Sequence, residues 1–191
     1  AGLSRYTERL AAHLLASQDE DDKSAQIRLT LFYNAHSGHE LPPSLARAPH
    51  LSTARGQYAW RIGALTSQIS GRPYPPLAAA LTQAGGGGPV VYHATEHLLP
   101  KTTHPAVLTV HDLIFERYPE HHTRRNMLFL RAAMPRFVRA AQAIIAVSTH
   151  TKRDLLEFYG ADPRRIHVIH EGIDPGFAPA RAMDVARVRD E

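Results

Sequence analysis

Short apolar runs alternate with amphipathic stretches along most of the chain. Four of the runs are continuous and rich in β-branched residues, and they span 90–92, 106–110, 143–147 and 166–169. Continuous runs of this length are typical of parallel strands that are buried on both faces. An earlier run, 27–33, places Ile27, Leu29, Leu31 and Tyr33 on one face and also predicts a strand. The chain therefore contains at least five predicted strands.

Helical periodicity separates these runs. Ser4 is expected to cap a first helix, with Tyr6, Leu10 and Leu14 on one face, and the polar run 19–23 is expected to end it. Further helices are predicted over 58–69, over 76–84, which the glycines 85–88 end, over 127–141 and from Ser148 to Gly160. Pro135 lies inside one of them and is expected to kink or split it. Residues 38–56 lack a period and predict a long loop.

Strands and helices in alternation predict an α/β domain, doubly wound around a mostly parallel sheet. A doubly wound domain normally begins with a strand, whereas this chain begins with a turn that enters a helix. Residues 184–191 resemble the start of another helix. We therefore expect a fragment that lacks its first strand.

Composition narrows the class of protein. The chain has 191 residues, of which 43% are hydrophobic and 21% charged, as in globular domains. It has no cysteine, which excludes disulfides and thiolate metal sites. No apolar stretch approaches the length of a membrane span, and no secretory signal is visible, so we expect a cytoplasmic protein. The net charge of +4 is spread along the chain and permits anionic partners without selecting one.

Four motifs occur in order from residue 1 to about residue 174. They are Ala1-Gly2-Leu3-Ser4-Arg5-Tyr6; Tyr92-His93-Ala94-Thr95 with Leu99-Pro100; Thr109-Val110-His111-Asp112-Leu113 with Tyr118-Pro119-Glu120; and Ala146-Val147-Ser148, Tyr159-Gly160, 165–169 and Glu171-Gly172-Ile173-Asp174. Together they resemble family 4 glycosyltransferases, the retaining GT-B group that includes many mannosyltransferases. One departure is Glu171, where that family usually has asparagine.

The resemblance implies that residues 1–178 form the N-terminal, acceptor-side Rossmann-like domain of a GT-B enzyme. Residues 179–191 would then lead into a donor-binding domain that the sequence does not contain. The full enzyme would move a hexose from a nucleotide-diphosphate sugar to a hydroxyl of a sugar or lipid-linked acceptor, with retention of configuration. The implied reaction requires neither metal nor cofactor, and this domain alone would be inactive.

A glycine turn at a helix start can bind the donor diphosphate through backbone N–H groups and the helix dipole. Gly2 and Arg5 are the candidates for this substrate-binding role. The residues alone favour a simpler interpretation, in which Gly2 makes a turn and Arg5 is solvated. The family resemblance favours the phosphate site.

His111 and Asp112 follow a buried strand at its carboxyl end, where open α/β sheets bind ligands. We interpret both as catalytic candidates, with His111 contacting sugar or acceptor and Asp112 able to fix its tautomer. Successive strand residues point to opposite faces, and the alternative is a hydrogen-bonded pair at a strand end. His93 is expected to end the neighbouring strand and line the same cleft. The resemblance adds Thr95, from the same motif, as a substrate-binding residue.

Other kinds of site have weaker support. His93 and His97 are four residues apart and His121 adjoins His122, but no HExxH or clustered ligand set occurs, so we predict no metal site. Nucleic-acid binding lacks a recognisable module. Five arginines between 124 and 139 are either a solvated helix face, the favoured interpretation, or a contact with anionic lipid. Two alternatives to the enzyme stay open: a regulatory ligand-binding module and a scaffold without turnover.

Overall fold

Two parallel sheets form the centre of the molecule. The computed structural model describes residues 2–17, 27–173, 180, 185 and 187–189. Within them, the larger sheet has the strand order β3-β4-β5-β6 and the smaller one pairs β1 with β2. The strands are Leu31–Asn34 (β1), His50–Thr53 (β2), Tyr92–Ala94 (β3), Ala106–Val110 (β4), Ala143–Ala146 (β5) and Ile166–Val168 (β6). Every strand pair is parallel.

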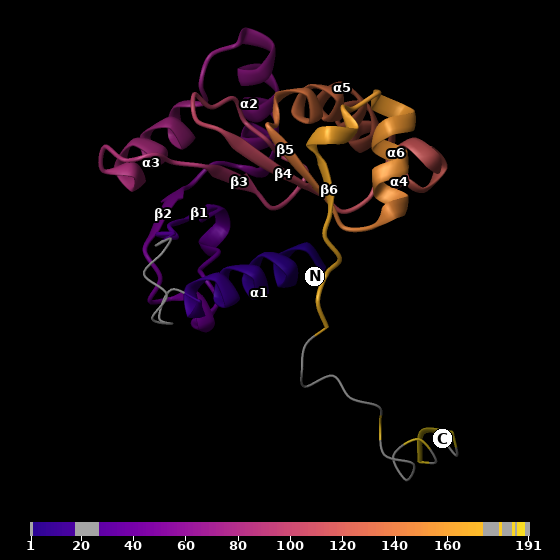
Figure 1. Ribbon diagram of the computed structural model, residues 1–191, viewed down its shortest axis with the longest axis horizontal. Helices are drawn as coiled ribbons and strands as arrows, with labels where there is room; N and C mark the ends of the chain where they lie inside the picture. The colour runs from indigo at the N-terminus through magenta and orange to yellow at the C-terminus, as the bar shows by residue number, and fades with distance from the viewer. Residues whose placement is uncertain (1, 18–26, 174–179, 181–184, 186, 190–191) are drawn as a thin grey trace.

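Helices lie on both sides of the larger sheet, with α2 and α5 on one side and α1 on the other (Figure 1). The helices are Gly2–Ala16 (α1), Gln57–Ser70 (α2), Pro75–Gly85 (α3), Ile114–Arg117 (α4), Arg124–Ala140 (α5) and Thr149–Tyr159 (α6). Parallel strands with helices on both sides of the sheet are the architecture of a doubly wound, Rossmann-like domain. The predicted α/β fold class is therefore confirmed.

The main core lies between the larger sheet and the helices α5 and α6. Leu108, Ile144, Phe137 and Leu155 have no exposed surface. A second cluster joins Tyr74, Leu77 and Leu81 of the α3 region with Phe32 of β1 and Trp60 of α2. Tyr92 of β3 packs against both clusters, so the two sheets share one continuous apolar interior.

Two predicted helices begin or continue differently from the expectation. α1 begins at Gly2, so Ser4 lies inside its first turn and does not cap it. α5 runs as a single helix through Pro135, so the predicted split is wrong. Burial explains this continuity: the residues around the proline, Ala133, Met134, Phe137 and Val138, are all buried against the sheet, and this packing offsets the lost backbone hydrogen bond.

α6 agrees with its prediction at both ends. The side chain of Ser148 accepts a hydrogen bond from the N–H of Thr151, and Gly160 ends the helix with φ of 56°.

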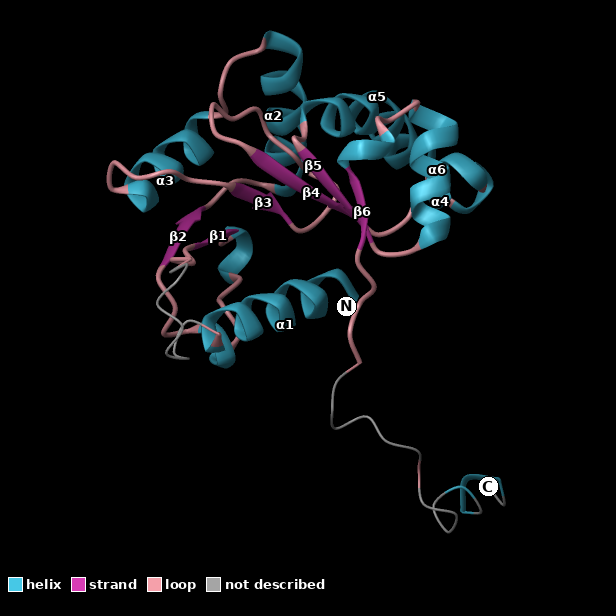
Figure 2. Cartoon of the chain, in the orientation of Figure 1, coloured by secondary structure: helices cyan, strands magenta, loops and turns pink. Residues whose placement is uncertain are grey.

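The strands also differ from their predicted bounds. β1 begins at Leu31, and Ile27 is exposed outside it. β3 begins at Tyr92, whose N–H donates to the carbonyl of Pro105, so His93 lies within the strand instead of at its end. The predicted loop 38–56 contains β2, which pairs with β1 (Figure 2). β2 was missed because its residues alternate between exposed and half-buried without a β-branched run.

Several predictions concern the ends of the chain. The polar run 19–23 lies outside the described residues, as does most of the predicted interdomain segment 179–191. Within that segment, residues 185 and 187–189 are helical and exposed. Among the residues that the structure describes, no helix is long and apolar enough to cross a membrane.

Candidate active site

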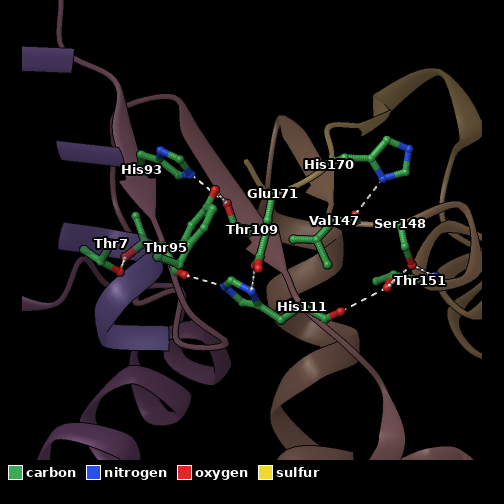
Figure 3. Close-up of polar contacts among 11 residues, drawn as sticks. Thr7, His93, Thr95, Thr109, His111, Val147, Ser148, Thr151, His170 and Glu171 are labelled. Atoms are coloured by element: carbon green, nitrogen blue, oxygen red, sulfur yellow. Dashed lines mark hydrogen bonds and ion pairs between the residues drawn. The ribbon is translucent and has the colours of Figure 1, made fainter. Parts of the chain in front are cut away.

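Polar side chains meet where the strands of the larger sheet end. Thr95 follows β3, His111 follows β4, Ser148 follows β5, and Glu171 lies three residues beyond β6. Because all four strands are parallel, these positions share one edge of the sheet. Figure 3 shows the side chains of this edge, with His111 between Thr95 and Glu171.

Both nitrogens of the His111 imidazole have a partner. Nε2 donates to the backbone carbonyl of Thr95 at 3.0 Å, and Nδ1 lies 2.9 Å from Oε1 of Glu171. The carbonyl and the ionised carboxylate are both acceptors, so the imidazolium, with a hydrogen on each nitrogen, satisfies both contacts at once. The side chain of His111 is 9% exposed and that of Glu171 is 48% exposed, so the pair lies at the border between protein and solvent.

Two aromatic rings cover His111. The ring of Tyr6, from the first turns of α1, meets it edge-on with 4.8 Å between the centroids. His97 does the same at 6.1 Å. Edge-to-face packing of this kind is favourable and holds a ring in one orientation. The orientation of His111 is therefore fixed by two hydrogen bonds and two ring contacts.

A chain of hydroxyl contacts connects α1 to the sheet edge. Oγ1 of Thr7 donates to Oγ1 of Thr95 at 2.8 Å, and the hydroxyl of Tyr6 lies 3.4 Å from Oγ1 of Thr109. Nε2 of His93 lies 2.8 Å from the same Thr109 oxygen, which is fully buried. His93 thus bonds to the neighbouring strand, and Thr109 and Tyr6 connect it with His111.

The carboxylate of Asp112 makes a backbone hydrogen bond. Its Oδ1 accepts a hydrogen bond from the N–H of Ile114, at the start of the turn into α4. Among the hydrogen bonds of the described residues, the carboxylate at His111 is that of Glu171, which lies 60 positions away in the sequence.

The backbone of His111 is held from the other side by α6. Oγ1 of Thr151 donates to the carbonyl of His111 at 3.0 Å and lies 3.0 Å from Oγ of Ser148. The cap of α6 and the active-site strand end are therefore one hydrogen-bonded unit (Figure 3). Beyond the ends of β5 and β6, Nδ1 of His170 donates to the carbonyl of Val147 at 3.2 Å.

Gly2 and Arg5, the residues predicted for the diphosphate, lie in the first turn of α1, and Arg5 is exposed. Gly2 is helical and makes no separate turn. Tyr6 follows directly and contacts His111, so the N-terminal end of α1 lies beside the histidine. The structure thus brings Thr95 and His111 into contact, places the start of α1 next to them, and gives His111 the carboxylate of Glu171 as its partner.

Burial sets the charge state of several neighbours. Loss of water lowers the pKa of His93 and favours its neutral form. Burial also lowers the pKa of His97, while Asp112 acts in the opposite direction. Nε2 of His97 is buried and has no hydrogen-bond partner among the described residues. The pKa of Glu96 is raised by desolvation, against the opposing effects of Arg61 and His111.

Two small pockets lie away from this edge of the sheet. One of about 30 Å³ lies near the amino ends of the strands and is lined by Gln68, Lys101 and Gln142. Another of about 70 Å³ is lined by Pro135, Tyr159 and Arg165. Neither includes His93, His111 or Glu171, and neither has room for a sugar. No group of three or more metal-ligating side chains occurs in the described ranges, and the absence of a metal requirement stays a prediction.

Sequence reasoning missed two residues of the site, Tyr6 and Glu171. Tyr6 was read as one of the apolar positions of the first helix, although its hydroxyl and ring both face the sheet edge. Glu171 was noted as a departure from a motif but was given no partner. The signal for it was positional, because it follows a parallel strand at the same edge as His111.

Comparison with known proteins identifies the family of the chain. A search of curated proteins found no match. The family model described as Glycosyltransferase Family 4 matches residues 1–177. The match covers all six strands of the described residues and the sheet edge at which His111, Thr95 and Glu171 meet. The chain belongs to Glycosyltransferase Family 4.

Proposed function

We propose that the full-length protein transfers a hexose from a nucleotide-diphosphate sugar to a hydroxyl group of an acceptor, with retention of configuration. One observation carries the proposal: His111 is held at the carboxyl edge of the sheet, directly beside the N-terminal end of α1. A group that can touch a sugar and a helix end that attracts an anion thus lie together.

The reaction needs these two features at one place. The bond from the anomeric carbon of the hexose to the diphosphate oxygen breaks, and a bond from that carbon to the acceptor oxygen forms. The nucleoside diphosphate leaves with the bonding electrons and takes up the proton that the acceptor hydroxyl loses. Negative charge therefore grows on the diphosphate in the transition state, and fixed donors that face it lower the barrier.

The start of α1 supplies such donors. The first backbone N–H groups of a helix have no partner within the helix, and its dipole adds positive charge at that end. Gly2 has no side chain to cover its backbone, and the exposed Arg5 adds a positive charge in the same turn. We assign the donor diphosphate to this end and the sugar to His111, with Thr95 beside it.

The remaining donor contacts belong, in this proposal, to a second domain that closes over the edge and excludes water. The acceptor is a sugar or a lipid-linked sugar, and the domain on its own is inactive. Arg124, Arg125, Arg136 and Arg139 are exposed on α5, which is compatible with contact with an anionic membrane. Arg125 also lies over the ring of Tyr58 at 3.9 Å, so part of this face is used within the domain.

The test is transfer activity of the full-length protein with a panel of nucleotide sugars. Replacing His111→Ala is expected to lower turnover by about a hundredfold, the scale of a lost catalytic group. His121→Ala is the matched control, because its side chain is 71% exposed. Equal turnover of the two variants would refute the assignment of His111. A protein that binds ligand but turns over no donor would instead be a binding module.

A further inference from the structure

The imidazole of His111 has one nitrogen in a partly buried contact and the other in an exposed contact. The bond from Nε2 to the Thr95 carbonyl is partly buried, while the contact of Nδ1 with Glu171 is exposed. The rings of Tyr6 and His97 cover other parts of the imidazole. A ligand that approaches His111 from solvent therefore meets Nδ1 and the Glu171 carboxylate together.

The two groups have complementary hydrogen-bonding properties. Nδ1 donates a hydrogen, and a carboxylate only accepts. A hydroxyl group can do both at once, since its oxygen accepts from Nδ1 and its hydrogen points to Oε1 of Glu171. A phosphoryl or carboxylate oxygen has no hydrogen to offer and meets Glu171 with like charge.

We propose that Glu171 is a specificity-determining residue: with His111 it selects a hydroxyl of a neutral sugar over an anionic oxygen at this point of the site. The inference rests on the proposed function and adds a substrate preference to it. It also separates the site into two parts, because the anionic end of a donor is directed to the start of α1 and the uncharged sugar to the His111–Glu171 pair.

The chain offers close controls for this proposal. Glu171→Gln keeps the size and shape of the side chain and removes its charge. Glu120→Gln is the matched control, because Glu120 is 64% exposed and lies 3.8 Å from another histidine, His121. Each variant removes one negative charge, so a difference in binding between them is due to the position of the lost charge and not to the net charge.

The experiment is a titration of the isotope-labelled chain, followed by the ring signals of His111 in NMR spectra. The neutral probe is methyl α-mannopyranoside and the anionic probe is inorganic phosphate. The wild type and Glu120→Gln are expected to respond at His111 to the sugar in preference to phosphate. In Glu171→Gln the ratio of the two affinities is expected to shift toward phosphate by about tenfold, the scale of one charge-assisted hydrogen bond.

An unchanged ratio in Glu171→Gln would overturn the proposal, as would a wild-type protein in which phosphate binds at His111 as well as the sugar does. A lack of response to both probes in all three proteins also counts against it. The backbone amide spectrum shows in each case that the variant is folded. Transfer activity that depends on His111, together with an unchanged ratio, would retain the proposed function and reject the role of Glu171 alone.

Discussion

At the scale of single residues, Gly63 illustrates how tightly the second core cluster is packed. A Cβ atom at this position would lie 2.6 Å from Cε2 of Tyr74. The Tyr74 ring cannot retreat easily, because it is buried and packs edge-on against Trp60 with 5.4 Å between the centroids. The absence of a side chain at Gly63 is thus what lets α2 approach the start of α3.

Gly63→Ala is therefore expected to destabilise the protein, although alanine favours a helix over glycine by about 1 kcal/mol. Overpacking costs about 1–3 kcal/mol, and the gap of 2.6 Å is too short for real Cβ contacts, so we expect a net loss of up to about 2 kcal/mol. Urea unfolding followed by the fluorescence of Trp60, the single tryptophan, measures the change. Gly172→Ala is the control, because a Cβ there has open space. A Gly63→Ala protein more stable than the wild type would contradict the packing argument.

The buried histidines predict a pH dependence of stability. Burial lowers the pKa of His93 and of His97 below the ordinary value of 6.5. The unfolded chain then takes up protons near that pH while the folded protein does not. The contribution of these two histidines to the free energy of unfolding is accordingly largest above pH 6.5. It falls as the pH is lowered through that value, by up to about 1.4 kcal/mol per pH unit for each histidine.

His93→Gln is expected to reduce this fall between pH 7.5 and pH 5.5. Urea titrations at the two pH values give the difference. Ile144→Val serves as the control, since it removes one buried methylene and should lower stability by about 0.5–1.5 kcal/mol equally at both pH values. The same fall in His93→Gln as in the wild type would show that His93 does not contribute to it.

At the scale of elements, the N-cap of α6 provides the clearest local prediction. The Ser148 hydroxyl accepts from the N–H of Thr151 at 3.0 Å. Ser148→Ala removes this bond and is expected to lower the free energy of unfolding by about 1 kcal/mol. Thr149→Ala, at an exposed position of the same first turn, should change it much less. Equal effects of the two substitutions in urea unfolding would argue against the cap.

Elements with a strong local signal were predictable from the sequence. The run 106–110 became β4 with the predicted bounds, and Gly160 ended α6 as expected. The missed elements depend on distant partners. β2 exists because β1 pairs with it, and Pro135 stays within α5 because the helix packs on the sheet. Neither effect is visible in a window of neighbouring residues.

The meeting of His111 and Thr95 was also predictable, because each residue follows a strand that has a strong local signal. His111 and Thr95 follow parallel strands, and strand ends of this kind meet at one edge. The carboxylate partner was predicted as Asp112, its sequence neighbour. In the structure the carboxylate partner of His111 is that of Glu171. Adjacent residues of a strand point to opposite faces, whereas residues that follow different strands of a parallel sheet can lie on the same side of its edge.

At the scale of the whole molecule, stability is expected to differ between the two sheets. β4 and β5 lie inside the larger sheet with a neighbour on each side, whereas β2 pairs with β1 alone. Leu108 and Ile144 are fully buried, while alternate residues of β2 are exposed. Well-packed central strands open only when the whole domain unfolds, and less covered elements open earlier.

Amide hydrogen exchange is thus expected to be slowest in β4 and β5 and faster in β1 and β2. Exchange measured residue by residue by NMR tests this order. Added urea should speed exchange in β4 and β5 most, because their opening exposes the most surface. Equal protection in the two sheets would show that they unfold as one cooperative unit.

Thr151 has a consequence for protein engineering. Its hydroxyl belongs to the cap of α6 and also holds the carbonyl of His111 at 3.0 Å. A substitution at Thr151 or Ser148 that is chosen to make the protein more heat-resistant will therefore move the histidine as well. A screen for thermostable variants should therefore find few neutral changes at this corner, because each substitution there alters the helix cap and the support of His111 together.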